Sequence, residues 1–153
     1  MTDPGRVLSW PEAADDPAFR DRFLRPPVTL ALDFDGTLAP FVPERLDARI
    51  SPELLPLLED LAAHPRVRLA FVTGRPALEL RSLLALSRPV EVWGSHGGEK
   101  LDLDGLLTRQ PMTPRQSAGL GEARVRAGRL GLGGRCEVKH AGLAAHWRGP
   151  PGA

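Results

Sequence analysis

The most constraining feature of this sequence is a largely apolar run, residues 28–32, that leads directly into Asp33-Phe34-Asp35-Gly36-Thr37. The run predicts a buried β-strand over 28–33, and the glycine allows a sharp turn just after it. This strand would present the carboxylates of Asp33 and Asp35 at its carboxyl end. Because ligands bind beyond that end of an open parallel sheet, we expect the functional site there.

Two further strand–helix steps follow at short intervals. Strands are predicted over Val67–Val72 and Val90–Trp93, with a helix before each. The first helix has a capping signal at Ser51-Pro52-Glu53, while Pro56 predicts that it kinks or starts late. Pro76 opens the second helix. This alternation favours an α/β fold of right-handed βαβ units with a parallel, doubly wound sheet.

After Pro111 the sequence changes character. A hairpin over 101–107 turns at Asp104-Gly105, and a capping box at Thr113 opens a helix that runs to about Leu130. Two short strands are predicted over 135–140 and 143–147. We therefore expect three parts: a leader over 1–26 with a short helix near 17–24, an α/β core over 27–110, and a partial α/β cap domain over 111–153.

Composition and net charge limit the classes of function that this chain can have. With 153 residues and a net charge of +1, bulk electrostatics argue against a nucleic-acid or membrane partner. Cys136 is the single cysteine, so no intrachain disulfide forms, and no apolar run is long enough to span a bilayer; we expect a cytoplasmic protein. Residues 111–153 hold seven basic and two acidic side chains, which either face an anionic substrate or form a solvated helix face.

The paired carboxylates suit phosphoryl transfer. Asp33 is the candidate nucleophile that forms an aspartyl-phosphate, and Asp35 lies close enough to move the proton. Because two carboxylates repel a phosphate dianion, a hard cation such as Mg²⁺ is expected beside them. The alternative, a turn without function, is disfavoured by the apolar strand that precedes it.

The ends of the next two strands supply candidate ligands. Thr73 offers a hydroxyl to a phosphate oxygen, and the amides of Gly74 and Arg75 open the following helix, whose start favours anions. Arg75 binds substrate or braces the loop; the sequence does not separate these roles. His96 and Glu99 flank two glycines, where a ligand can approach the backbone, although a lone histidine is as often structural.

Glu137 and Lys139 stand two residues apart on a predicted strand and share one face. Such a pair suits sugar hydroxyls together with a phosphate if that face lines a cleft. The alternative is a solvated strand face.

Four segments resemble the haloacid-dehalogenase (HAD) phosphohydrolase superfamily and, more narrowly, the trehalose-6-phosphate phosphatases, over about Val28 to Pro150. They are L-D-F-D-G-T-L-A-P, F-V-T-G-R-P, W-G-S-H-G-G-E and C-E-V-K-H-A-G-L-A-A-H-W-R. The first is common to the superfamily. The last two segments, by their order and spacing, narrow the resemblance from the superfamily to the trehalose-6-phosphate phosphatases.

The resemblance implies a HAD-like Rossmannoid core and hydrolysis of trehalose 6-phosphate in trehalose biosynthesis, functionally linked to trehalose-6-phosphate synthase. It assigns Asp33 as nucleophile, Asp35 as acid/base and Thr73 as phosphate ligand. Mg²⁺ would bind the Asp33 carboxylate and the Asp35 main-chain carbonyl. Glu137 and Lys139 match cap positions that hold the trehalose moiety.

The resemblance also implies a later lysine and a later acidic cluster. No lysine follows Lys139 and no acidic residue follows Glu137. We therefore expect a C-terminally truncated chain, with the strand over 28–32 left as an unpaired edge, poor solubility and negligible turnover by residues 1–153. The alternatives are a phosphatase for other sugar phosphates and an inactive remnant.

Overall fold

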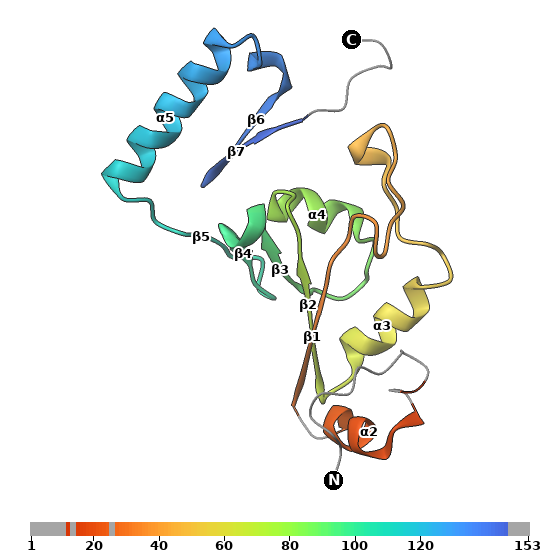
Figure 1. Ribbon diagram of the computed structural model, residues 1–153. Coiled ribbons are helices and arrows are strands. Elements are labelled where there is room, and N and C mark those ends of the chain that lie inside the picture. The colour runs from red at the N-terminus through yellow and green to blue at the C-terminus, as the bar shows by residue number, and fades with distance from the viewer. Residues whose placement is uncertain (1–11, 13–14, 25–26, 147–153) are drawn as a thin grey trace.

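The computed structural model describes residues 12, 15–24 and 27–146, and it contains two separate β-sheets (Figure 1). The helices are α2 (Pro17–Leu24), α3 (Leu55–Ala63), α4 (Ala77–Leu83) and α5 (Pro114–Arg129), with single 3₁₀ turns at Arg45–Asp47, Ser95–Gly97 and Gly133–Arg135. The strands are β1 (Val28–Leu32), β2 (Val67–Val72), β3 (Glu91–Gly94), β4 (Glu99–Leu101), β5 (Leu107–Arg109), β6 (Cys136–Lys139) and β7 (Gly142–Ala145). Most of the predicted leader, and Arg148 in the last resembling segment, lie outside the described residues.

The larger sheet has the order β1-β2-β3-β4-β5. Strands β1, β2 and β3 run parallel, with Leu32 opposite Phe71, and β4 and β5 continue the sheet antiparallel. The predicted α/β fold with a parallel core is confirmed. The predicted hairpin is β4–β5, and Gly105 in its turn has a φ of +81°.

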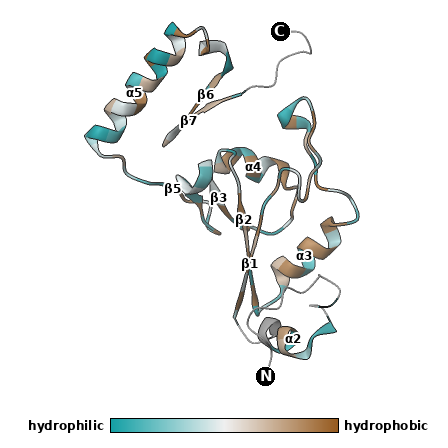
Figure 2. Cartoon of the chain, viewed as in Figure 1, coloured by the Kyte–Doolittle hydropathy of each residue, from teal (hydrophilic) through white to brown (hydrophobic). Residues whose placement is uncertain are grey.

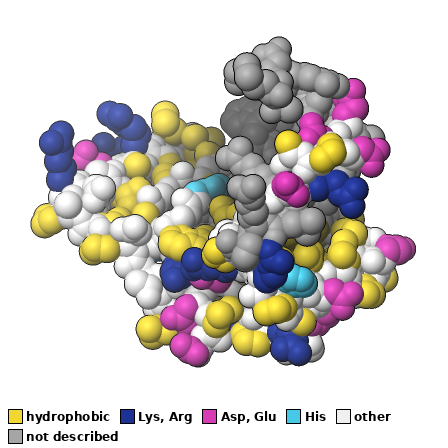
Figure 3. All heavy atoms as spheres, turned by 90° about the horizontal axis from the view of Figure 1, so that it is seen from below, with side chains coloured by type: hydrophobic (Ala, Val, Ile, Leu, Met, Phe, Trp, Pro, Cys, Tyr) yellow, Lys and Arg dark blue, Asp and Glu magenta, His cyan; other side chains and the backbone are white. Residues whose placement is uncertain are grey.

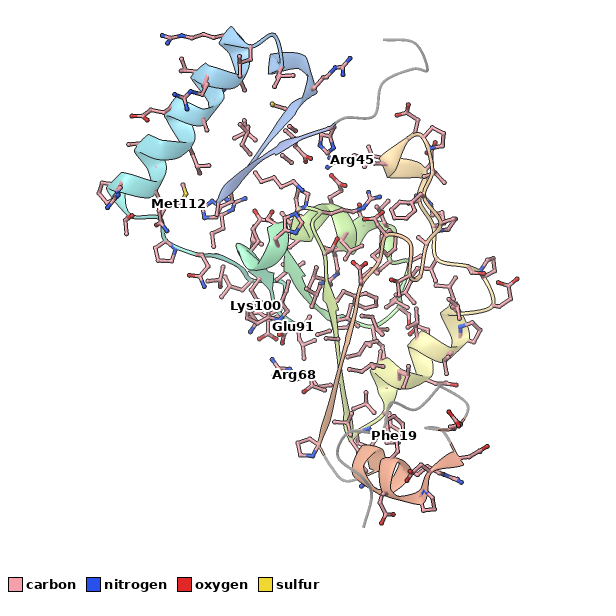
Figure 4. All side chains as sticks on the ribbon, in the orientation of Figure 1. Phe19, Arg45, Arg68, Glu91, Lys100 and Met112 are labelled. Carbon is pink, nitrogen blue, oxygen red and sulfur yellow. The ribbon has the colours of Figure 1, made fainter. Side chains whose placement is uncertain are left out.

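Helices α3 and α4 pack into one hydrophobic cluster, which includes Leu58, Leu80 and the sheet residues Phe71 and Val92. The opposite face of the sheet carries Arg68, Glu91, Trp93 and Lys100; three of these are labelled in Figure 4. Helices α3 and α4 therefore cover the same face of the sheet, so these two helices do not form the expected doubly wound arrangement. Two successive right-handed crossovers in the order β1-β2-β3 place both helices on the same side.

Strand β1 is an edge strand within the described part of the chain. Leu30 and Leu32 pack against the core, whereas Thr29 and Ala31 are exposed. The strand predicted to be buried is only half-buried, because among the described residues α3 and α4 cover one of its faces. The expected edge position is the one observed.

Helix α3 begins at Leu55, later than the capping signal suggests. The Ser51 hydroxyl bonds to the side chain of Glu53, and no side chain caps the helix. The predicted cap was wrong and the predicted late start is confirmed. Pro56, which lacks an N–H, is tolerated because it lies in the first turn.

The second unit consists of α5, β6 and β7, and its helix and sheet pack on each other. The predicted capping box is present: the Gln116 amide donates to Thr113 Oγ1 (3.3 Å), and the Thr113 amide donates to Gln116 Oε1 (2.9 Å). Figure 2 shows long hydrophilic stretches on α5, whereas α3 is mostly hydrophobic. The chain joins the two units through residues 110–113; the domain boundaries drawn from the sequence stay a prediction.

The described surface mixes charges of both signs. On the face shown in Figure 3, hydrophobic side chains lie among acidic and basic ones. None of the helices in the described residues has the length and apolar character needed to cross a membrane.

Candidate active site

The carboxyl ends of β1, β2 and β3 meet at one edge of the larger sheet, as the topology predicted. The Thr73 amide donates to the Trp93 carbonyl (2.9 Å), which joins the ends of β2 and β3. The turns beyond them are also joined, because the His96 amide donates to the Thr73 carbonyl (3.0 Å) and the Ser95 amide to the Arg75 carbonyl (2.7 Å). The two turns therefore form one rigid platform.

The turn after β1 holds the two candidate carboxylates outside the core. Phe34 lies between them and is fully buried, so it anchors the turn. Gly36 has a φ of +81°, in the left-handed region that favours glycine. Asp33 is exposed, and one of its oxygens accepts a long hydrogen bond from Thr37 Oγ1 (3.5 Å). Its carboxylate is thus open to an incoming substrate.

Asp35 forms a two-point ion pair with Arg75. Arg75 Nε and Nη2 donate to the two carboxylate oxygens of Asp35 at 2.8 and 2.7 Å. Arg75 Nη1 donates to Glu79 (3.0 Å) and to the carbonyl of Arg45 (2.6 Å). The hydrogen bond with Asp35 is the main cause of a raised pKa of the Arg75 guanidinium, which burial opposes. This guanidinium braces the loop; its contact with phosphate stays a prediction.

Thr73 and Gly74 form the turn after β2. Thr73 is 3% exposed, and its hydroxyl oxygen accepts from the Arg75 amide (3.1 Å), so its own hydrogen is left for another acceptor. A Cβ on Gly74 would lie 2.6 Å from the His96 ring, so the imidazole lies directly against this backbone. Ser95 and His96 both have φ above +50°, a strained conformation that is common at functional sites.

Glu99 occupies the start of α4. The Ala77 amide donates to Glu99 Oε2 and Arg109 Nε to Oε1, each at 3.0 Å. Burial raises the pKa of the Glu99 carboxyl, but these bonds outweigh it and leave the pKa below its ordinary value. Helix α4 begins at Ala77, so the Glu99 carboxylate binds at the start of this helix. This is the anion-binding position that the sequence predicted for phosphate.

A pocket of about 600 Å³ lies between the strand ends and the second unit. It brings together six of the predicted site residues, namely Asp35, Gly74, Arg75, His96, Glu137 and Lys139. Asp33, Thr73 and Glu99 are not among its lining residues. Lys139 Nζ donates to the Gly74 carbonyl (2.5 Å), so the second unit reaches the turn after β2.

The pocket also contains residues that were not predicted as site residues, among them Arg45 and His146, the latter within the last resembling segment. Arg45 Nη1 donates to Glu137 Oε1 (2.8 Å), and His146 Nε2 lies 3.0 Å from Glu137 Oε2. Burial raises the pKa of Glu137, but the bonds with Arg45 and His146 outweigh it and the pKa lies below its ordinary value. Arg45 lies in a single 3₁₀ turn, within a loop whose sequence has no hydrophobic periodicity, so no sequence signal pointed to it.

The fit of the residues to Mg²⁺ follows from their donors. Arg75 occupies the Asp35 carboxylate, which leaves the Asp33 carboxylate and the Asp35 carbonyl as oxygen ligands. Within the described ranges, no three His, Cys, Asp or Glu side chains cluster as a metal site would require. Mg²⁺ is often held by one or two protein oxygens, with phosphate and water completing the shell, so the two oxygens fit this mode.

The segment that contains the carboxyl ends of β1, β2 and β3 matches a known protein family. Residues 31–105 match the family model described as Trehalose-phosphatase. This segment, just under half of the chain, is similar to the trehalose-phosphatase family. The matched segment includes Asp33, Asp35, Thr73 and His96, and it ends before the second unit.

Relatives of the trehalose-phosphatase segment are longer proteins. A glucosylglycerol-phosphate synthase of Pseudomonas anguilliseptica is 37% identical over 92 residues, which is 58% of this chain and 11% of the relative. The C-terminal domain of a C. albicans trehalose-6-phosphate phosphatase superposes with a TM-score of 0.63 at 21% identity, covering 79% of this chain and 43% of that chain. A haloacid dehalogenase-like hydrolase of B. subtilis gives 0.54 at 20%, covering 69% and 34%. The fold is therefore that of the HAD-like phosphatases, and the chain spans less than half the length of these relatives.

Proposed function

We propose that this site belongs to a phosphatase that hydrolyses trehalose 6-phosphate to trehalose and phosphate through an aspartyl-phosphate on Asp33. One observation carries the proposal: Asp35, beside the candidate nucleophile, lines the same pocket as Glu137 and Lys139 of the second unit. The match of residues 31–105 to the Trehalose-phosphatase family model supports phosphatase chemistry.

The proposed reaction has two displacements. The Asp33 carboxylate attacks phosphorus, the bond from phosphorus to the sugar oxygen breaks, and Asp35 donates a proton to that oxygen. Water then attacks the aspartyl-phosphate, Asp35 takes the proton, and phosphate leaves with Asp33 regenerated. Because Arg75 engages both oxygens of Asp35, proton transfer requires one oxygen to turn from the guanidinium toward the substrate.

Phosphate would bind at the strand ends beside the pocket, close to Asp33 and Thr73, and the sugar would bind in the pocket itself. On the core side, the Thr73 hydroxyl has a hydrogen to donate to a phosphate oxygen. On the other side, Glu137 accepts hydrogen bonds from sugar hydroxyls and Lys139 donates to the substrate. Of the described lysine and arginine residues after Pro111, only Lys139 lines this pocket. The arginines of α5 are exposed, which favours the solvated-face interpretation for them.

Mg²⁺ held by the Asp33 carboxylate and the Asp35 carbonyl would offset the charge of a phosphate beside two carboxylates. The residues of the chain then orient the substrate and move the proton. A cytoplasmic location and a functional link to trehalose-6-phosphate synthase belong to the same proposal.

The test measures binding and phosphate release together. Residues 1–153 are titrated with trehalose 6-phosphate and glucose 6-phosphate, with Mg²⁺ or with chelator, and Asp33→Asn is the control for turnover. We expect saturable binding of trehalose 6-phosphate, weakened by Glu137→Gln, and negligible release. Asp33-dependent release would support the phosphatase and contradict the expected inactivity of this chain. Equal binding of both sugars would favour a general sugar phosphatase, and no binding would overturn the proposal.

A further inference from the structure

The α5–β6–β7 unit meets the core through polar contacts. The main hydrophobic cluster draws its described members from the first unit and none from α5, β6 or β7. The contacts that cross the pocket are the ion pair between Arg45 and Glu137 and the bond from Lys139 to the Gly74 carbonyl. Beside the linker, His140 Nε2 lies 2.7 Å from the Gln110 carbonyl. The position of the second unit over the pocket therefore depends on a few polar and charged side chains.

Arg45 is the centre of this contact. Its guanidinium contacts Glu79 of α4 and Glu137 of β6 at once, and its carbonyl accepts from Arg75 (2.6 Å). Figure 4 shows Arg45 on the core loop beside the β6–β7 sheet. Glu79 and Glu137 are 17% and 21% exposed, so the cation lies between two largely desolvated carboxylates. A chain of ion pairs thus runs from Asp35 through Arg75, Glu79 and Arg45 to Glu137.

We propose that Arg45 is a positioning residue, which orients Glu137 toward the pocket and holds the α5–β6–β7 unit over Asp35. Arg45 engages one oxygen of Glu137 and His146 the other. Because a carboxylate oxygen has two lone pairs, each oxygen can still accept from a sugar hydroxyl. Without Arg45, Glu79 and Glu137 lose the cation that links them, and Glu137 turns away from its present orientation.

The exposure of Arg45 makes this link sensitive to salt. Its side chain is 45% exposed, and exposed ion pairs weaken as ionic strength rises. We therefore expect the second unit to sit closed over the pocket at low salt and to sample wider positions at high salt.

The conformational test measures the distance between the two units by electron paramagnetic resonance. Spin labels at Asp60 on α3 and Arg124 on α5, both exposed, are introduced by cysteine substitution in a Cys136→Ser background. We expect one narrow distance distribution at low salt, broadened by salt, by Arg45→Gln and by Glu137→Gln. The control Arg115→Gln removes the same charge from exposed α5 and should leave the distribution narrow.

A distribution that stays narrow in both Arg45→Gln and Glu137→Gln would overturn the proposal. The two variants break the same ion pair from either side. If one of them fails to fold, the other still tests the proposal. This readout needs no substrate, so it is independent of the proposed function.

The second readout rests on the proposed function and uses trehalose 6-phosphate and inorganic phosphate as separate probes. We expect Arg45→Gln to weaken trehalose 6-phosphate about threefold to tenfold, with Arg45→Lys in between, and to leave inorganic phosphate unchanged. Equal weakening of both probes would overturn the assignment to the sugar side. Binding of neither probe by the unsubstituted chain would count against the proposed function while leaving the distance measurement intact.

Discussion

The guanidinium of Arg75 grips both carboxylate oxygens of Asp35, at 2.7 and 2.8 Å, although the two residues are on different turns. Arg75 is 8% exposed and stacks over the Phe34 ring at 5.4 Å. The pair therefore fixes the turn after β1 to the turn after β2, and it sets the orientation of the candidate acid/base.

Breaking this pair should destabilise the fold. We expect Arg75→Met to lower the free energy of unfolding by about 2 kcal/mol, because Asp35 and Glu79 lose a buried cationic partner. Arg75→Lys should lose less, since it keeps the charge without the planar fork. Urea unfolding measures both, with exposed Arg124→Met as a surface control. Equal stability of Arg75→Met and the unsubstituted chain would contradict this account.

Acid should destabilise the protein through Glu99 and Glu137. The pKa of each carboxyl is lowered in the folded state, so the stability it contributes is complete above the ordinary value of 4.5 and is lost as the pH falls through the lowered pKa. Glu99→Gln should flatten this acid limb and cost about 1–3 kcal/mol near neutral pH. Thermal unfolding from pH 7 to 3 checks both effects, with exposed Glu122→Gln as the control.

Two glycines should respond in opposite directions to alanine. A Cβ on Gly94 would lie 2.4 Å from the Ala77 backbone nitrogen, whereas one on Gly119 meets no atom within 4 Å. We expect Gly119→Ala to stabilise α5 by about 0.5–1 kcal/mol, because alanine is the better helix former. Gly94→Ala should force β3 away from α4 and lower the melting temperature markedly. If Gly94→Ala melted like the unsubstituted chain, the packing described here would be incorrect.

The exposed edge of β1 should drive self-association. Its backbone groups on the outer side pair with no other strand in the described chain, and Ala31 beside them is exposed. We expect residues 1–153 to associate as concentration rises, and Ala31→Lys to reduce this without lowering stability. Analytical ultracentrifugation measures the association of both proteins. A monomer at every concentration would argue against an open edge on β1.

Local signals predicted most elements of this fold. Strand β2 lies where its apolar run predicted it, α5 has the capping box expected at Thr113, and the β4–β5 turn uses the expected Gly105. The half-exposed state of β1 was not predictable from its own residues, since it depends on which faces of the sheet the rest of the chain covers. The failed cap at Ser51 has a local cause, because its hydroxyl bonds to Glu53 instead.

The candidate site was predictable where residues follow strands in the sequence. Asp35, Thr73 and His96 come after three successive strands, so topology alone brings them to one edge. The role of Glu99 as a partner of the Ala77 amide, and the position of Arg45 between two carboxylates, depend on tertiary contacts. Such contacts leave no periodic trace in a single sequence.

The contact of Gly74 with the His96 ring also has an evolutionary consequence. Because a Cβ at position 74 would lie 2.6 Å from that ring, position 74 is restricted to glycine while His96 is kept. Alanine at 74 should be tolerated far better once His96→Ala has cleared the space than in the present background. A lineage that first replaces His96 with a small residue can then replace Gly74, whereas the reverse order passes through a destabilised protein. The turns after β2 and β3 therefore restrict the order of substitutions as well as the structure.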